Sequence, residues 1–241
     1  MKYFTKKWFA DTVLAEMCFQ VKKTAKAEEL SEKYYLSLYK DQKKWFIKNE
    51  KFIAKHNKVK FDLEAAEAAF EASHRENLDY VKANVPAEIL DKVADLRVLA
   101  LGCASYDVHD ALVRFCGKVN HRCEQVTEAY DAEVEQLAEK IGWEKINLLN
   151  RLSNSAIELC EKSVNGNFVF ATSAEYTGVP CRVDLLNARV IKCDEGLVGS
   201  AVAHFEILPS ESGALTFSAL CQNLDGSLME FSAEMDDFEV I

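Results

Sequence analysis

The spacing of apolar residues along the chain changes once, near residue 155, from a helical period to an alternating one. Before this point apolar side chains recur every three or four residues, which is typical of amphipathic helices. After it they alternate with polar side chains, which is typical of strands with one buried face. Helices first and strands afterwards predict an α+β fold rather than a parallel sheet interleaved with helices.

The first region, residues 1–152, is expected to be helical. Thr24 and Asp62 are side chains that can cap helix N-termini, and Pro86 suits a first helical turn. The predicted helical segments are Thr5–Val21, a segment after Thr24 that leads into the Lys-rich stretch Lys40–Lys60, then Leu63–Lys82, Ala87–Leu101 and Ser105–Lys140.

The last of these helices carries the clearest pattern. Its apolar positions alternate steps of three and four residues, which predicts a long helix packed along one seam. These positions are Leu112, Cys116, Val119, Cys123, Val126, Tyr130, Val134 and Leu137. Gly117 interrupts the pattern at a cost of about 1 kcal/mol, which is too little to end the helix.

The second region, residues 153–241, is expected to form an antiparallel β-meander packed on the helices. Asn165-Gly166 is a strong hairpin signal, because both turn positions favour residues that tolerate a positive φ. Short turns without intervening helices connect the remaining strands. The predicted strands are Ser155–Val164, Asn167–Ser173, Arg182–Lys192, Gly199–Leu208, Ala214–Gln222, Ser227–Glu234 and Phe238–Ile241, and the turns include Glu175–Pro180 and Ser210–Gly213.

Composition narrows the class of protein. The 241 residues contain 49% apolar side chains and only 9 Gly and 3 Pro, which indicates an ordered globular chain with long regular elements. The chain lacks both an apolar run of about 18 residues and a secretory signal pattern, so we expect no membrane partner. The eight Cys are irregularly spaced without a Cys-x-x-Cys pair, which favours reduced thiols and a cytoplasmic location.

Charge is unevenly distributed. Residues 1–60 contain 15 Lys and 7 acidic residues, a net charge of +8, whereas the whole chain has a net charge of −10. No Lys or Arg follows Lys192, although ten acidic residues do. The two ends either neutralise each other, within one fold or across a dimer, or the acidic end attracts a basic partner, because a surface of one sign steers association.

Three segments resemble a family of uncharacterised bacterial proteins, mostly from Gram-positive organisms. They are the opening Met-Lys-Tyr-Phe-Thr-Lys-x-Trp of residues 1–8, the Asp-x-Arg-Val-Leu-Ala-Leu-Gly of residues 95–102, and the pattern from Val183 to the closing Asp-Asp-Phe-Glu-Val-Ile. The family is a domain of unknown function, so the resemblance implies a bacterial, cytosolic protein but no activity and no catalytic residue.

Candidate chemical groups have simpler explanations. Cys116 and Cys123 lie about 10 Å apart along one helix face and His121 points away, so these residues are not expected to bind zinc. Glu71-x-x-His74 has the spacing of a di-iron half-site, but no second copy exists. No nucleophile elbow or nucleotide-binding loop occurs, and we expect no cofactor.

Two function classes remain. The leading hypothesis is a non-enzymatic protein-binding module that presents an acidic sheet face to a basic protein. Alternation along Ser227–Glu234 places Glu230 and Glu234 on the outward face, opposite Met229 and Phe231. The alternative is an enzyme, such as a hydrolase, with an unfamiliar site between helices and sheet. Nucleic-acid binding by Lys40–Lys60 is disfavoured, because that segment lacks Arg and the chain is acidic.

Overall fold

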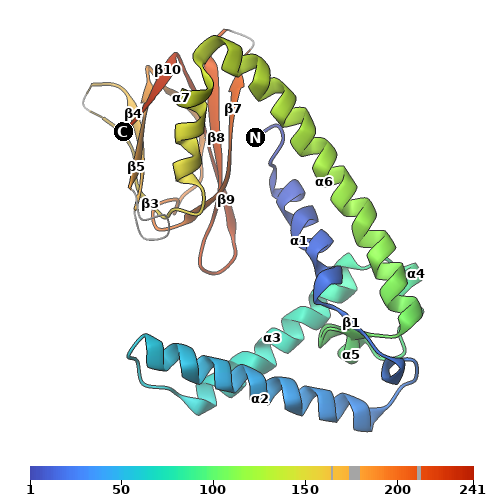
Figure 1. The fold of residues 1–241 in the computed structure, drawn as a ribbon. Helices are drawn as coiled ribbons and strands as arrows, with labels where there is room; N and C mark the ends of the chain where they lie inside the picture. The colour runs from blue at the N-terminus through green and yellow to red at the C-terminus, as the bar shows by residue number, and fades with distance from the viewer. Residues whose placement is uncertain (164, 174–179, 211–212) are drawn as a thin grey trace. The chain divides into compact units, whose positions relative to one another are not determined.

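A computed structural model describes residues 1–163, 165–173, 180–210 and 213–241 and confirms the α+β fold class. The chain forms two compact units: Thr12–Asn120, here called the helical unit, and Met1–Asp11 with His121–Ile241, here called the β unit. Helices α1 (Lys6–Gln20) and α6 (Tyr106–Ile141) both pass from one unit into the other (Figure 1). The units therefore do not coincide with the predicted regions 1–152 and 153–241.

The helical unit contains parts of α1 and α6, further helices and one short pair of strands. These elements are β1 (Lys22–Lys23), η1 (Ala25–Ala27), α2 (Glu32–His56), α3 (Leu63–Asn84), α4 (Ala87–Leu90), α5 (Leu96–Ala100) and β2 (Cys103–Ala104). Asp62 caps α3 as predicted, its carboxylate accepting a hydrogen bond from the Ala65 amide at 3.1 Å. Helix α2 is a single helix whose N-cap is Ser31, not Thr24, which caps η1.

The predicted helix Ala87–Leu101 is wrong, because the structure divides it into α4 and α5. Helix α4 ends at Leu90, and Asp95 is the N-cap of the next helix. The backbone of Asp95 is extended, and its carboxylate accepts a hydrogen bond from the Arg97 amide at 2.9 Å. An Asp in this conformation satisfies a free amide at a helix start and so favours a new N-terminus over a continuing helix.

One seam of α6 supplies much of the buried surface, as the heptad-like spacing predicts. Leu112 and Val119 have no exposed surface, and Cys116 is 1% exposed. In the helical unit, Leu112 packs in a core with Val21, Val81 and Leu99, which come from α1, α3 and α5 or their ends. Gly117 lies within the unbroken 36-residue helix.

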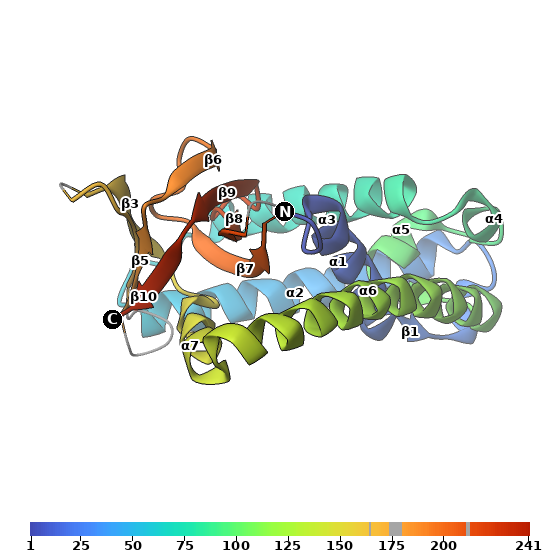
Figure 2. The same ribbon diagram turned by 90° about the horizontal axis from the view of Figure 1, so that it is seen from above.

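Two four-stranded antiparallel sheets form the β unit, together with the C-terminal part of α6, α7 (Trp143–Leu148) and η2 (Leu149–Leu152) (Figure 2). One sheet has the order β10-β5-β4-β3 and the other β6-β9-β8-β7. The strands are β3 (Ile157–Lys162), β4 (Phe168–Thr172), β5 (Cys181–Leu186), β6 (Arg189–Cys193), β7 (Ala201–Pro209), β8 (Leu215–Gln222), β9 (Leu228–Met235) and β10 (Asp237–Val240).

This strand order corrects the prediction of a simple meander. Strands β3-β4-β5 and β7-β8-β9 are meanders, but β6 pairs with β9 and β10 pairs with β5. Apolar faces of both sheets share one core with α6 and α7, and within it the Phe170 ring packs edge-on against Phe217 and at a tilt against Phe231. The predicted turns at 175–180 and 210–213 fall largely outside the described residues.

The N-terminal segment joins the β unit through a buried carboxylate. Glu206 on β7 is 1% exposed, and its oxygens accept hydrogen bonds from the backbone amides of Lys2, Tyr3 and Phe4 at 2.9, 2.6 and 2.5 Å. The Phe4 ring packs against Tyr130 of α6, with centroids 4.7 Å apart. Residues 2–4 are thus held against β7 by Glu206, which lies more than 200 residues away in the sequence.

Candidate binding groove of the helical unit

A groove of about 790 Å³ lies entirely within the helical unit. This volume is in the range of ligand-binding sites, which are mostly apolar with a few polar groups. Its lining comes from α1, α2, α3 and the segment from α5 to Cys103: Val13, Met17, Gln20, Val21, Lys22, Leu38, Asp41, Gln42, Trp45, Asn77, Tyr80, Val81, Leu99, Ala100, Leu101, Gly102 and Cys103.

Helical periodicity explains how α2 contributes to this groove. Leu38, Asp41, Gln42 and Trp45 follow steps of three, one and three residues and therefore share one side of the helix. Trp45 is 68% exposed although it is a large aromatic side chain. The α2 wall of the groove thus presents an apolar ring to solvent where a ligand could cover it.

A hydrogen bond ties the two walls of the groove together. Gln42 Nε2 donates to the backbone carbonyl of Leu101 at 2.5 Å. Gly102 follows with a φ of 71°, a left-handed conformation that other residues adopt only under strain. A Cβ at this position would lie 3.2 Å from the carbonyl oxygen of Gln20, so a glycine also allows the close approach of α1.

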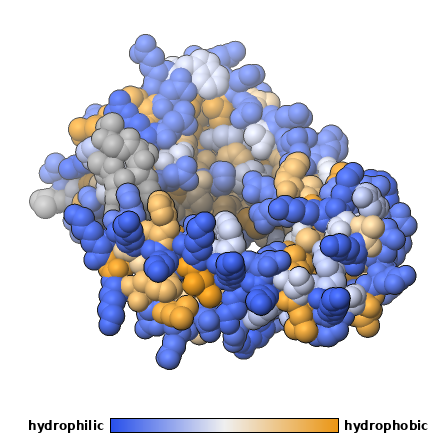
Figure 3. All heavy atoms as spheres, turned by 60° about the horizontal axis from the view of Figure 1, so that its bottom comes forward, coloured by the Kyte–Doolittle hydropathy of each residue, from blue (hydrophilic) through white to orange (hydrophobic). Residues whose placement is uncertain are grey.

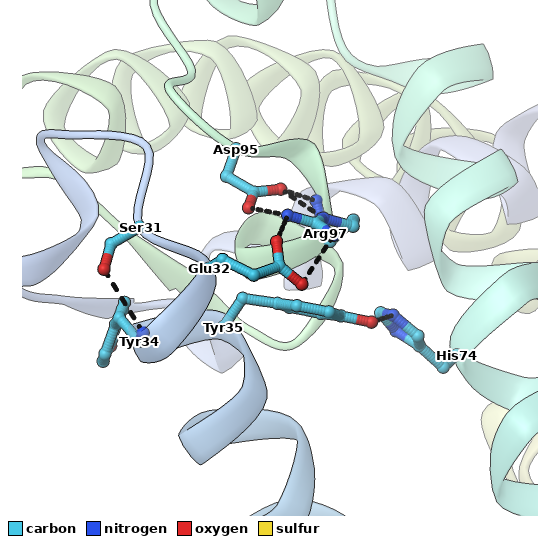
Figure 4. A network of polar contacts seen from close by, with 7 residues as sticks. All are labelled: Ser31, Glu32, Tyr34, Tyr35, His74, Asp95 and Arg97. Atoms are coloured by element: carbon cyan, nitrogen blue, oxygen red, sulfur yellow. Dashed lines mark hydrogen bonds and ion pairs between the residues drawn. The ribbon is translucent and has the colours of Figure 1, made fainter.

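An ionic network beside the groove holds α5 against α2 (Figure 4). Arg97 donates to both oxygens of Asp95, at 3.0 and 2.8 Å, and to Glu32 at 2.7 Å. Its guanidinium carbon also lies 4.1 Å from the ring centroid of Tyr35. These hydrogen bonds lower the pKa of Asp95 and raise that of Arg97, so both stay charged and keep α5 in place.

His74 extends this network between α2 and α3. Its Nε2 lies 3.4 Å from the Tyr35 hydroxyl, and its Nδ1 has no hydrogen-bond partner among the described residues. Burial lowers the pKa of His74, and the positive charge of Arg97 lowers it further. Glu71 is in an ion pair with Lys43 at 3.2 Å instead of sharing a site with the imidazole. His74 is therefore a neutral packing residue of this helix pair.

Glu230 and Glu234, the residues expected to bind a partner, lie in the β unit on β9. Alternation holds, because Met229, Phe231 and Ala233 are buried. Both carboxylates form ion pairs with the neighbouring strand β6: Glu230 with Lys192 at 2.7 Å and Glu234 with Arg189 at 2.5 Å. Their side chains are only 17% and 28% exposed. Binding of a basic protein at this face stays a prediction.

The cysteine and histidine residues of the described part of the chain form no metal site. Among the described residues, no group of three or more His, Cys, Asp or Glu side chains is placed to hold a metal ion. All eight Cys are free, six are buried and Cys193 is exposed. Burial raises the pKa of Cys160 and Cys221 to about 12, which makes both thiols poor nucleophiles.

Neither the groove nor its ionic network was predicted from the sequence. Trp45 lies in the Lys-rich stretch Lys40–Lys60, for which we predicted no groove, and Asp95 and Arg97 belong to one of the segments that carry the family resemblance. A usable signal was present in α2, where Leu38, Trp45 and Phe52 recur every seven residues. That spacing predicts that the three side chains share one side of the helix, although it does not predict that this side remains exposed to solvent.

Comparisons with known proteins add no identification. No protein-family model matches the chain, and neither a curated protein nor a solved structure is significantly similar to it. The resemblance to an uncharacterised bacterial family accordingly stays a prediction. In the part of the chain that the structure describes, no helix combines the length and apolar character needed to cross a bilayer.

Proposed function

We propose that this protein is a non-enzymatic binding protein and that the groove of the helical unit holds the apolar part of its ligand. The observation that carries the proposal is the exposed Trp45 in the wall of a groove of about 790 Å³. The groove walls are held by Arg97 and Gln42, so the site is formed before a ligand arrives. Preformed sites bind more tightly, because less conformational entropy is lost on binding.

Titration with the neutral apolar dye N-phenyl-1-naphthylamine tests this proposal. The dye should become fluorescent in the groove, and Trp45→Lys should weaken its binding about tenfold, which corresponds to about 1.4 kcal/mol of lost apolar contact. Leu36→Lys is the matched control, since Leu36 is also exposed on α2 but does not line the groove. Equal dye affinities for the wild type and both variants would refute the proposal.

The acidic face of β9 is the second candidate, supported by the outward placement of Glu230 and Glu234. A basic partner would have to displace Lys192 and Arg189 from these carboxylates. Binding of poly-lysine that is lost in the double variant Glu230→Gln/Glu234→Gln would support this face. The same affinity for the wild type and the double variant would exclude it.

We also propose that the protein works in a reducing, cytoplasmic compartment, which the free and mostly buried thiols support. Thiol labelling of freshly isolated protein, unfolded without reductant, should count about eight thiols per chain. A count near zero would contradict this location.

A further inference from the structure

Helix α2 also carries a stripe of lysines beside the groove. Lys44, Lys48, Lys51 and Lys55 follow steps of four, three and four residues, so they share one side of the helix over about 16 Å. All four are exposed. None of them is in an ion pair with a residue that the structure describes, whereas Lys43, on the α3 side, is bound to Glu67 and Glu71.

Apolar side chains run parallel to this stripe. Phe52 is 69% exposed and lies two turns after Trp45 on the same side of α2. In a helix of 3.6 residues per turn, Lys48 lies about 40 to 60° around the axis from both aromatic residues. The groove side of α2 is therefore a row of aromatic rings flanked by a row of unpaired cations. On the face shown in Figure 3, apolar side chains likewise form orange patches bordered by hydrophilic ones.

Acidic groups near this surface are few. Asp41 lines the groove, Glu50 is half-buried, and Glu32 is bound to Arg97. Although Asp41 lies within one turn of Lys44 on α2, none of these described carboxylates forms an ion pair with the four lysines. Such a surface attracts a partner with carboxylates, because complementary charge speeds association and sets the register of binding.

We propose that the groove binds an acidic amphipathic helix of another protein, an inference that rests on the proposed function. The apolar side chains of this helix enter the groove beside Trp45 and continue along Phe52 on the same side of α2. Its carboxylates face Lys44, Lys48, Lys51 and Lys55. A helix laid in an apolar groove is a common mode of peptide recognition. The geometry favours it over a lipid surface, because a membrane needs a protruding apolar face and the lining of this site is concave.

A designed peptide of 14 residues, with Leu on one face and Glu flanking it, tests the inference by fluorescence anisotropy. It should bind more tightly than a peptide in which Lys replaces each Glu. The quadruple variant Lys44→Gln/Lys48→Gln/Lys51→Gln/Lys55→Gln should bind it about 10- to 30-fold more weakly, since each exposed ion pair contributes roughly a twofold effect. The affinity of the wild type should also fall as salt is raised.

Controls separate this inference from the proposed function. Replacing the exposed Lys92, Lys118, Lys140 and Lys162 by Gln changes the net charge equally and should leave peptide affinity unchanged. Dye binding without a preference for the acidic peptide would overturn the inference but keep the groove. Absence of dye and peptide binding would overturn both. Tighter binding to phosphatidylserine vesicles or to a single-stranded oligonucleotide than to the peptide would overturn the acidic helix as the partner.

Discussion

We expect Glu206→Gln to destabilise the β unit strongly, although the change removes only one charge and hardly alters volume. The carboxylate accepts three backbone amides, with Lys2 bound to Oε2 and both Tyr3 and Phe4 to Oε1. A glutamine has a single acceptor oxygen. Oriented to keep Tyr3 and Phe4, it would point its NH₂ group at the Lys2 amide, so that two donors face each other.

The magnitude follows from these contacts. A hydrogen bond to a charged group contributes about 1.5–3 kcal/mol, and the bond to the Lys2 amide is lost outright. The two bonds that remain lose their charge assistance, which reduces each by about half. Because Lys2 is exposed and its amide can bind water instead, we expect a total loss of about 2–4 kcal/mol in the free energy of unfolding. This is a large fraction of the stability of an ordinary domain.

Urea unfolding followed by fluorescence measures this loss. In a Trp45→Phe background the remaining Trp8 and Trp143 both report on the β unit. Glu239→Gln is the control, because Glu239 is an exposed carboxylate on β10. Trypsin should also cleave after Lys6 or Lys7 faster in Glu206→Gln. A loss below about 0.5 kcal/mol, equal to that of the control, would refute the reasoning that the buried carboxylate anchors the N-terminal segment.

Three further predictions concern the core, the histidines and the thiols. Leu112→Ala should destabilise the helical unit by about 2–5 kcal/mol in urea unfolding, while the exposed neighbour Val113→Ala should cost under about 1 kcal/mol. Burial lowers the pKa of His74 and His204 below the ordinary 6.5, so the unfolded chain binds more protons than the folded chain. The free energy of unfolding should therefore fall as pH drops below about 6.5. If His74→Phe leaves the loss of stability between pH 7 and 5 unchanged, His74 is excluded as its cause. In folded protein one thiol, Cys193, should react rapidly with Ellman's reagent, and Cys193→Ser should abolish that fast phase.

Patterns that depend on local repetition were predictable from the sequence. The α6 seam and the alternation on β9 both follow from side-chain period, and each decided which residues are buried. Asp62 was recognised as a cap because a carboxylate at a helix start satisfies free amides. Such features require only a few neighbouring residues.

Features that join distant segments were not predictable. The break between α4 and α5 depends on Asp95, whose carboxylate also binds Arg97 and so serves two structural roles. The pairing of Glu230 and Glu234 with β6 depends on the order of strands in the sheet, which alternation alone does not determine. The groove depends on four separate segments, so no single stretch of sequence contains its pattern.

The division of the β unit into two separate stretches of chain has a consequence for folding during synthesis. Residues 12–120 are continuous and can pack as soon as they leave the ribosome, whereas the amides of Lys2, Tyr3 and Phe4 must wait for Glu206. After Tyr3 another 203 residues, up to and including Glu206, must be added, which takes about 10–40 s at rates of about 5–20 residues per second. During that interval Phe4 and Trp8 lack their partner His204, and this segment of the nascent chain offers aromatic side chains to chaperones.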